Sequence, residues 1–193
     1  MRQAAAPLLT LALALTPTAA RAELDSTGWS KLLGEAVIDG YVDYRQWADN
    51  PRFDALVEQI AATDTSGMSR EGKLVFYINA YNILAARGIL DGSSPSGLIG
   101  RHVYFKRDKY RIAGERISLH QLEHEWIRPL GEPRIHFAIV CASASCPILQ
   151  NQAYTLENLD AQGPLPLDLD LSVVGHAEHA LLLGTVPARE RRG

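Results

Sequence analysis

Two cysteines, Cys141 and Cys146, are the residues of this sequence best suited to covalent chemistry, and they flank the small-residue run 142–145. A cysteine acts as a nucleophile when its pKa is lowered, a base lies within hydrogen-bond reach and a third group orients that base. The sequence offers residues for the two supporting roles in His124, His136, Asn79 and Asn82. A Cys-His-Asn site is therefore one hypothesis for this chain.

This hypothesis divides the candidates into two groups. The candidate catalytic residues are Cys146, Cys141, His124 and Asn79. The candidate binding residues are Asn82, His136, Ser143 and Ser145, and the amides of the loop near 143–146 would form an oxyanion hole. His136 and Cys141 stand five positions apart in an apolar run that indicates a strand, so their side chains would point to opposite faces. His124, on a preceding helix, is the better base for Cys146.

A structural role is the favoured interpretation of the same residues. In an oxidising compartment an even pair of cysteines suggests a disulfide, and a buried Cys141 would otherwise be an inert core residue. Asparagine is unfavourable inside a helix, so Asn79 and Asn82, one turn apart, are expected to have a specific task. We favour hydrogen bonds that lock neighbouring loops over the orientation of a histidine or the binding of a substrate amide.

A metal site is the weakest of the chemical interpretations. The run His120-Gln121-Leu122-Glu123-His124 has the letters of an inverted zinc-protease motif, in which two histidines at i and i+4 share one helical face. A catalytic zinc would need a third ligand, and five-letter patterns often match by chance. We therefore expect no metal and no cofactor.

Helices are expected wherever apolar residues recur at helical spacing behind a capping residue. The caps are Asn50, which precedes a proline at the first helical position, Ser69, Ser118 and Thr155. The resulting helices lie at 29–37, from 50 onward, from 69 to about 88, from 118 to 129 and from 155 onward. The helix from Ser69, which carries both asparagines, has the strongest pattern.

Short extended segments fall between these helices. We expect strands at 41–44, 103–105, 109–112 and 116–117, with a loop at 91–100. The nearly all-apolar run 135–141 indicates a central strand buried on both faces, with the cysteine loop at its carboxyl end. The predicted fold class is α+β, a single domain with a small, mainly antiparallel sheet packed by helices.

Charge and composition limit the choice of partners. The chain has a formal net charge of -3, which gives no global attraction for nucleic acid or anionic lipid, so we expect neither as a partner. One local exception is a basic hairpin region, in which a solvated sheet face is favoured over an anionic ligand site. Its cations are Arg101, Lys106, Arg107, Lys109, Arg111 and Arg116.

The N-terminus has the features of a secretory signal peptide over residues 1–22. Arg2 supplies a positive charge, the apolar run 8–15 is too short to span a bilayer, and Ala20-Arg21-Ala22 is a small-x-small cleavage site. Cleavage after Ala22 would leave Glu23 as the first mature residue. We therefore expect a periplasmic or secreted protein that does not span a membrane.

Four motifs in order resemble the bacterial domain of unknown function 547 family. They are Gly40 to Tyr44, Phe76 to Asn82, Leu119 to Arg128 with Glu123-His124, and His136 to Ala138 leading into Cys141-Ala142-Ser143 and Cys146-Pro147. The resemblance covers about 38–160, behind an N-terminal helix at 23–37. It implies a secreted or periplasmic α+β domain without an established reaction, and a distant likeness to papain-like or transglutaminase-like enzymes is fold analogy alone.

The tail at 161–193 departs from the family pattern of a longer helical segment with a closing aromatic and acidic motif. Our hypothesis is a frameshift near Ala161 or Gln162, a truncated gene or a disordered tail. For function, the sequence favours a periplasmic binding or structural module. The alternative is a cysteine-dependent hydrolase or acyltransferase.

Overall fold

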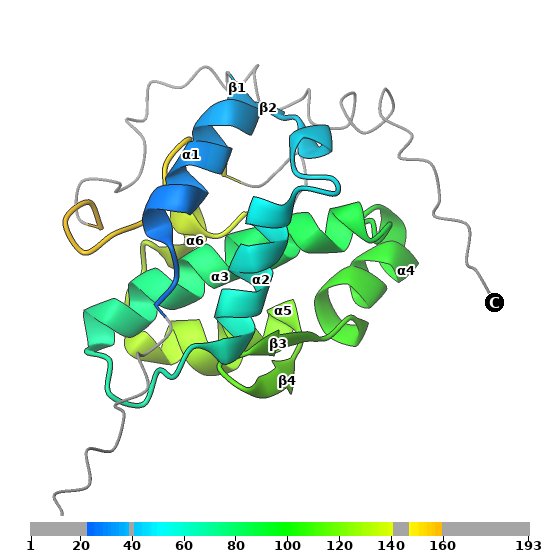
Figure 1. The fold of residues 1–193 in the computed structure, drawn as a ribbon. Coiled ribbons are helices and arrows are strands. Elements are labelled where there is room, and N and C mark those ends of the chain that lie inside the picture. The colour runs from blue at the N-terminus through cyan, green and yellow to red at the C-terminus, as the bar shows by residue number, and fades with distance from the viewer. Residues whose placement is uncertain (1–22, 39–40, 141–146, 160–193) are drawn as a thin grey trace, which may run out of the picture.

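The computed structural model describes residues 23–38, 41–140 and 147–159 of the chain (Figure 1). The helical segments are α1 (Ser26–Ala36), η1 (Tyr44–Gln46), α2 (Pro51–Ala62), α3 (Arg70–Leu90), α4 (Gly97–His102), η2 (Val103–Arg107), α5 (Leu119–Gln121), η3 (Leu122–Ile127), η4 (Arg128–Leu130) and α6 (Ile135–Ala138). Two antiparallel hairpins pair β1 (Val37–Ile38) with β2 (Tyr41–Val42) and β3 (Tyr110–Ile112) with β4 (Glu115–Ile117). The predicted α+β class, with small antiparallel sheets and packed helices, is confirmed.

Helix α3 is the centre of the fold and is buried along most of its length. The predicted cap is present, because the Ser69 hydroxyl accepts a hydrogen bond from the Gly72 amide at 3.0 Å. The helix continues to Leu90, past the predicted end at Gly88. A Cβ atom at Gly88 would lie 2.6 Å from the Tyr110 hydroxyl and 3.0 Å from the Tyr104 ring, so this glycine serves close packing inside the helix.

Helices α1 and α2 enclose an aromatic cluster on one side of the core. The Trp47 ring stacks on Phe53 at a centroid distance of 5.5 Å and meets Trp29 at 5.2 Å. The Trp47 indole donates its N–H to the Leu32 carbonyl at 3.1 Å, so its one polar atom is satisfied in the core. As predicted, Asn50 caps α2 ahead of a proline.

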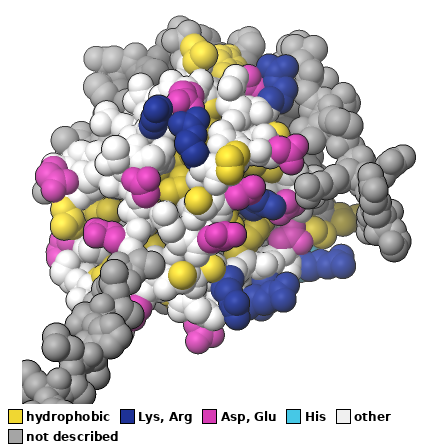
Figure 2. Space-filling model, viewed as in Figure 1, with side chains coloured by type: hydrophobic (Ala, Val, Ile, Leu, Met, Phe, Trp, Pro, Cys, Tyr) yellow, Lys and Arg dark blue, Asp and Glu magenta, His cyan; other side chains and the backbone are white. Residues whose placement is uncertain are grey.

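The β3–β4 hairpin is anchored to the end of α2. The amides of Ala113 and Gly114, both at positive φ, donate to the carbonyls of Ile60 and Ala61 at 2.9 and 3.0 Å. The exposed side chains of Arg111 and Arg116 stand directly opposite each other in this hairpin. Lysine and arginine side chains gather here, at the lower right of the molecule (Figure 2).

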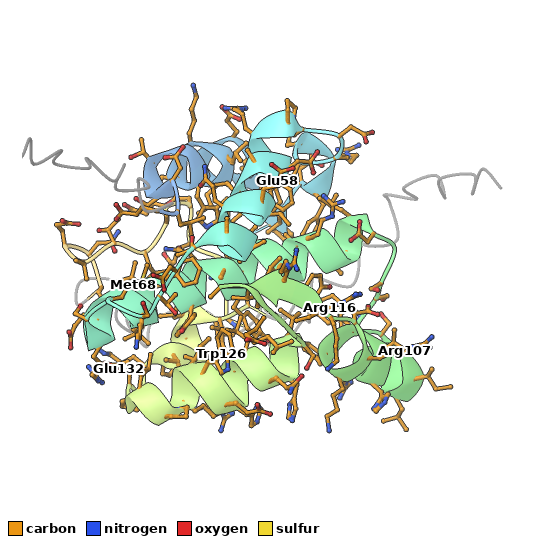
Figure 3. The ribbon with its side chains drawn as sticks, turned by 60° about the horizontal axis from the view of Figure 1, so that its bottom comes forward. Glu58, Met68, Arg107, Arg116, Trp126 and Glu132 are labelled. Atoms are coloured by element: carbon orange, nitrogen blue, oxygen red, sulfur yellow. The ribbon has the colours of Figure 1, made fainter. Side chains whose placement is uncertain are left out.

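A continuous helical run of α5, η3 and η4 follows the hairpin and packs under α3. Ser118 and Gln121 form a capping box at its start, as the predicted cap requires. Trp126 of η3 contacts Tyr77 of α3 at a centroid distance of 5.4 Å, and Figure 3 shows its place beneath α3.

The expected strand at 103–105 and the end of the expected loop at 91–100 are helical instead. The 103–105 segment belongs to η2, and the helix α4 occupies the end of the expected 91–100 loop. Tyr104 is fully buried and donates its hydroxyl to the Ala85 carbonyl at 2.7 Å, so packing against α3 overrides the β-propensity of this aromatic run.

The expected central strand 135–141 was also wrong where the structure describes it. Its first four residues form α6, and the chain becomes extended at Ile139. Ile135 and Ala138, three positions apart, are buried, whereas His136 and Phe137 are exposed. A short apolar run does not distinguish a strand from a helix, and here spacing of the buried residues decides for a helical turn.

Candidate functional site

Two asparagines of α3 hold two distant backbone segments. Asn82 donates its amide N–H to the Ala138 carbonyl and accepts from the Val140 amide, both at 2.9 Å. Asn79 donates to the Tyr154 carbonyl at 2.8 Å and accepts from the Tyr154 amide at 3.0 Å. We call these four hydrogen bonds the asparagine clamp. The predicted bonds between these asparagines and neighbouring loops are confirmed.

The clamp fixes the chain on both sides of the cysteine-bearing segment. Ala138 and Val140 precede residues 141–146, and Tyr154 follows them. Asn79 and Asn82 are only 1% and 4% exposed, so their hydrogen bonds form out of water, where an unmade bond is costly. Each side-chain amide satisfies one donor and one acceptor of the main chain. The clamp therefore fixes the main chain at Ala138 and Val140 and again at Tyr154.

A pocket of about 330 Å³ lies directly beside the clamp. Asn79 and Tyr154 line it together with apolar side chains from Met68, Val75, Phe76 and Leu156. Glu23 and Glu157 bring carboxylates to the same pocket. The volume falls within the range of small-molecule sites, and the lining combines apolar walls with a few polar groups.

Two of the residues that line this pocket, Tyr154 and Glu157, have shifted pKa values. Hydrogen bonds from its own backbone amide and from the Thr155 hydroxyl hold the pKa of Glu157 below its ordinary value, so the carboxylate is charged at neutral pH. Burial raises the pKa of Tyr154 to about 12, so the phenol keeps its proton. The lining of the pocket thus includes a charged carboxylate, Glu157, and a protonated phenol, Tyr154.

His124 lies on η3, with an exposed ring. Its Nδ1 lies 3.0 Å from the His120 carbonyl, and the two imidazole centroids are 4.0 Å apart. Because a carbonyl oxygen only accepts, Nδ1 carries the proton and Nε2 of the neutral ring is an acceptor. The pKa of His120 is lowered, first by burial and then by the neighbouring His124 charge.

The η3 helix and the clamp lie on different sides of α3. At about 100° per residue, Tyr77 and Tyr81 point away from Asn79 and Asn82 around the helix axis. The first pair faces η3: Tyr77 contacts its tryptophan, and the pKa of Tyr81 is raised first by burial and then by the Glu123 charge. The structure therefore brings the two asparagines together and places His124 on a separate helix, with no hydrogen bond between them in the described ranges.

Of the remaining predicted site residues, one is exposed on α6 and four lie outside the residues that the structure describes. His136 lies on the exposed side of α6. Cys141, Ser143, Ser145 and Cys146 lie outside the described residues. Within the described ranges, no group of three histidine, cysteine, aspartate or glutamate residues is arranged to hold a metal ion.

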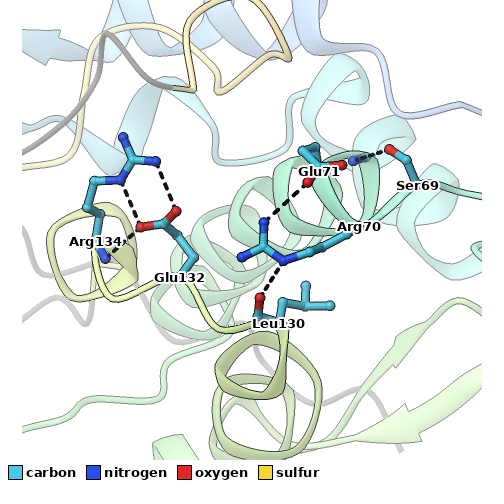
Figure 4. Close-up of polar contacts among 7 residues, drawn as sticks. Ser69, Arg70, Glu71, Leu130, Glu132 and Arg134 are labelled. Carbon is cyan, nitrogen blue, oxygen red and sulfur yellow. Dashed lines mark hydrogen bonds and ion pairs between the residues drawn. The ribbon is translucent and has the colours of Figure 1, made fainter.

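A polar junction that sequence reasoning missed ties the end of the η4 run to the start of α3 (Figure 4). Arg70 donates Nε–H to the Leu130 carbonyl at 2.6 Å. Nearby, Glu132 accepts from both the side chain and the backbone amide of Arg134, and these bonds lower the pKa of Glu132 to about 2.

No local sequence pattern identified the clamp's backbone partners or the pocket, because both join segments far apart in the chain.

Comparison with known proteins gives one match. The sequence model of the family described as "Protein of unknown function, DUF547" matches residues 65–163. The matched range contains three of the four motifs that carry the resemblance, and Gly40 to Tyr44 precedes it. No curated protein and no solved structure matches the chain. Across the described ranges, no helix has the length and apolarity that a bilayer crossing requires.

Proposed function

The chain belongs to the domain of unknown function 547 family, and on that premise we propose that it is an exported, periplasmic-type binding module. The asparagine clamp is the observation that carries this proposal. It holds the main chain at Ala138 and Val140, ahead of the cysteines in the sequence, and at Tyr154, after them. Asn79 and Tyr154 also form part of the wall of the adjoining pocket. In this function, the clamp presents the segment and shapes the pocket, and a Cys141–Cys146 disulfide closes the segment.

The chemistry of the lining indicates the kind of ligand. The walls bind an apolar group, because Met68, Val75, Phe76 and Leu156 surround it. The Glu157 carboxylate disfavours an anion at the rim and favours a neutral or cationic polar end. A small amphiphile without negative charge fits both features.

Export adds a further group to the same pocket. Glu23 is among its lining residues, and cleavage after Ala22 would turn its amide into an α-ammonium group. The mature chain would then hold one positive charge beside the two rim carboxylates. Edman sequencing of protein recovered from the periplasm of a Gram-negative host tests the cleavage: Glu-Leu-Asp at the N-terminus supports it, and an intact leader contradicts it.

A fluorescent probe tests the pocket directly. N-phenyl-1-naphthylamine is apolar and uncharged, so it should bind the pocket with enhanced emission. Leu156→Trp should block it, because Leu156 lines the pocket and is 59% exposed, which leaves room for the larger ring to turn inward. Ile38→Trp is the control, since Ile38 is 64% exposed on β1, away from the pocket lining. Equal loss of emission in both variants, or in neither, would refute the pocket as the site.

A cysteine-dependent hydrolase or acyltransferase is the second candidate, and one observation favours it. The His124 tautomer leaves Nε2 free to accept a proton, which is the state that a general base requires. The place of His124 across α3 from the clamp favours the binding module instead. A pH profile of alkylation at each cysteine, compared between the unmodified chain and His124→Ala, separates the two functions. Loss of a histidine-dependent thiolate in the variant supports the enzyme.

A further inference from the structure

The arginines of this protein fall into two groups by their partners. Within the described ranges, the arginines outside residues 101–116 all pair with a carboxylate; they are Arg45, Arg52, Arg70, Arg87, Arg128 and Arg134. The four arginines inside 101–116 form no ion pair with any described residue; they are Arg101, Arg107, Arg111 and Arg116. Lys106 and Lys109 accompany them, and all six side chains are exposed. We call these six residues the basic face.

The cations of the basic face lie close enough together to repel one another. Residues 101–116 contain six cations and two carboxylates, on a chain whose formal net charge is -3. Arg111 and Arg116 stand directly opposite each other across the β3–β4 ladder, and like charges in that position repel. An anion bound over the hairpin would relieve this repulsion.

A polar hollow lies within the basic face. Its volume is about 490 Å³, and its cations are Arg107, Lys109 and Arg116. Asp91 and Asp108 also line it: Asp91 pairs with Arg87, and the Asp108 carboxylate, which accepts a hydrogen bond from the Ser93 hydroxyl, offsets one of the three positive charges. Figure 3 shows Arg107 and Arg116 at the same end of the molecule, one on η2 and one on the hairpin.

Two exposed apolar side chains lie on α4, the helix that carries Arg101 and leads into η2 with Lys106 and Arg107. Leu98 and Ile99 of α4 are 84% and 81% exposed, the highest values among the large exposed hydrophobic residues in the described ranges. On a helix, positions three and four apart are neighbours, so Leu98 lies beside Arg101 and His102 on the same side of α4. Exposed aliphatic side chains on the same helical run as cations that form no ion pair are typical of a surface that binds a membrane interface.

We propose that the basic face docks the protein on a bilayer surface that contains anionic phospholipid. Leu98 and Ile99 enter the interface between headgroups and acyl chains, and the six cations lie over the phosphate layer. One phosphate headgroup occupies the hollow between Arg107, Lys109 and Arg116. The formal net charge of -3 opposes contact between the whole chain and an anionic membrane. However, charges farther from the bilayer than a Debye length, about 8 Å at physiological salt, are screened, so the cations of the basic face dominate the interaction.

The aliphatic pair distinguishes a bilayer from a soluble polyanion. Nucleic acid would use the cations but would gain nothing from Leu98 and Ile99, because its outer surface is a layer of charged phosphates. A bilayer uses both sets at once. Docking does not depend on the pocket beside the clamp, which is formed by other residues.

Vesicle co-sedimentation tests the proposal. The chain from Glu23 to Gly193 is used, because the apolar run 8–15 would itself associate with lipid, and vesicles of phosphatidylglycerol with phosphatidylcholine are compared with phosphatidylcholine alone. We expect binding to the anionic vesicles that falls as sodium chloride rises. Each Lys or Arg near an anionic surface contributes about 1 kcal/mol, or about fivefold in affinity, so Arg107→Gln with Lys109→Gln and Arg116→Gln should weaken binding about a hundredfold.

Two further variants decide between the sources of binding. Lys31→Gln with Arg45→Gln and Arg52→Gln removes the same charge at exposed positions elsewhere and should leave vesicle affinity nearly unchanged. Leu98→Ser with Ile99→Ser should weaken vesicle binding and leave retention on heparin unchanged. Equal losses in the two charge variants, full vesicle affinity in the serine variant, or no preference for anionic vesicles would each overturn the proposal. Circular dichroism confirms that these exposed substitutions keep the fold.

Discussion

Asn79→Ala is the perturbation that tests the asparagine clamp most severely. The substitution removes both hydrogen bonds to Tyr154, whose side of the clamp is buried. Both the N–H and the carbonyl of Tyr154 lose their partner, and each buried main-chain group left without one costs about 1–3 kcal/mol. We therefore expect the free energy of unfolding to fall by about 2–6 kcal/mol, a large part of the stability of a domain of this size.

Urea denaturation followed by tryptophan fluorescence measures this change, with the slope checked for constancy. Asn50→Ala is the matched control, because Asn50 is a helix cap outside the clamp, and its loss should cost about 1 kcal/mol. Hydrogen exchange locates the effect: the Tyr154 amide should lose protection in Asn79→Ala and keep it in Asn50→Ala. A loss of stability no greater than that of the control, with a protected Tyr154 amide, would refute the clamp.

Three further predictions follow from single contacts. Gly88→Ala should destabilise the protein by about 1–3 kcal/mol in thermal unfolding, because the new Cβ would lie 2.6 Å from the Tyr110 hydroxyl. Gly34→Ala is the control and should be neutral or stabilising, because its new Cβ would lie 3.9 Å from the Asn151 carbonyl oxygen. Tyr104→Phe should cost about 0.5–1.5 kcal/mol, since it removes one buried hydrogen bond to the Ala85 carbonyl of α3; an unchanged melting temperature would contradict this. Because Arg134 lowers the pKa of Glu132 to about 2 from an ordinary 4.5, the stability from this pair is present above about pH 4.5 and is lost as pH falls toward 2. Glu132→Gln should reduce that part of the acid-induced loss, and an identical acid profile would argue against the pair.

The elements that local chemistry determines were predictable from the sequence. Asn50, Ser69 and Ser118 each start a helix through a side-chain oxygen, and the turn at 113–114 joins two strands as its composition indicates. Caps and turns depend on neighbouring residues alone, so a single sequence contains the information that they require.

The errors arose where long-range packing overrides local preference. Tyr104 and its neighbours have the composition of a strand, yet a buried hydroxyl contact with α3 holds them in a helix. The run from Ile135 is nearly all apolar, and only the folded structure shows that His136 and Phe137 face outward. No local pattern contains those contacts.

The site shows the same division. The unusual presence of Asn79 and Asn82 inside a helix indicated hydrogen bonds to loops, and these exist. Their partners at 138–140 and 154 are 56 to 75 positions away along the chain, so neither the partners nor the pocket could be assigned from sequence. The unpaired state of the basic face is likewise a property of which carboxylates lie near each arginine in space.

Thiol accessibility in the purified chain from Glu23 onward tests the central claim most directly, namely that the clamped segment is a structural element of a binding module. The protein is alkylated at neutral pH with and without reductant, and mass spectrometry reads the modification at Cys141 and Cys146. The binding module predicts that both thiols react only after reduction. Rapid alkylation of one cysteine without reductant, abolished in His124→Ala, would contradict the account and establish a cysteine-histidine pair in its place.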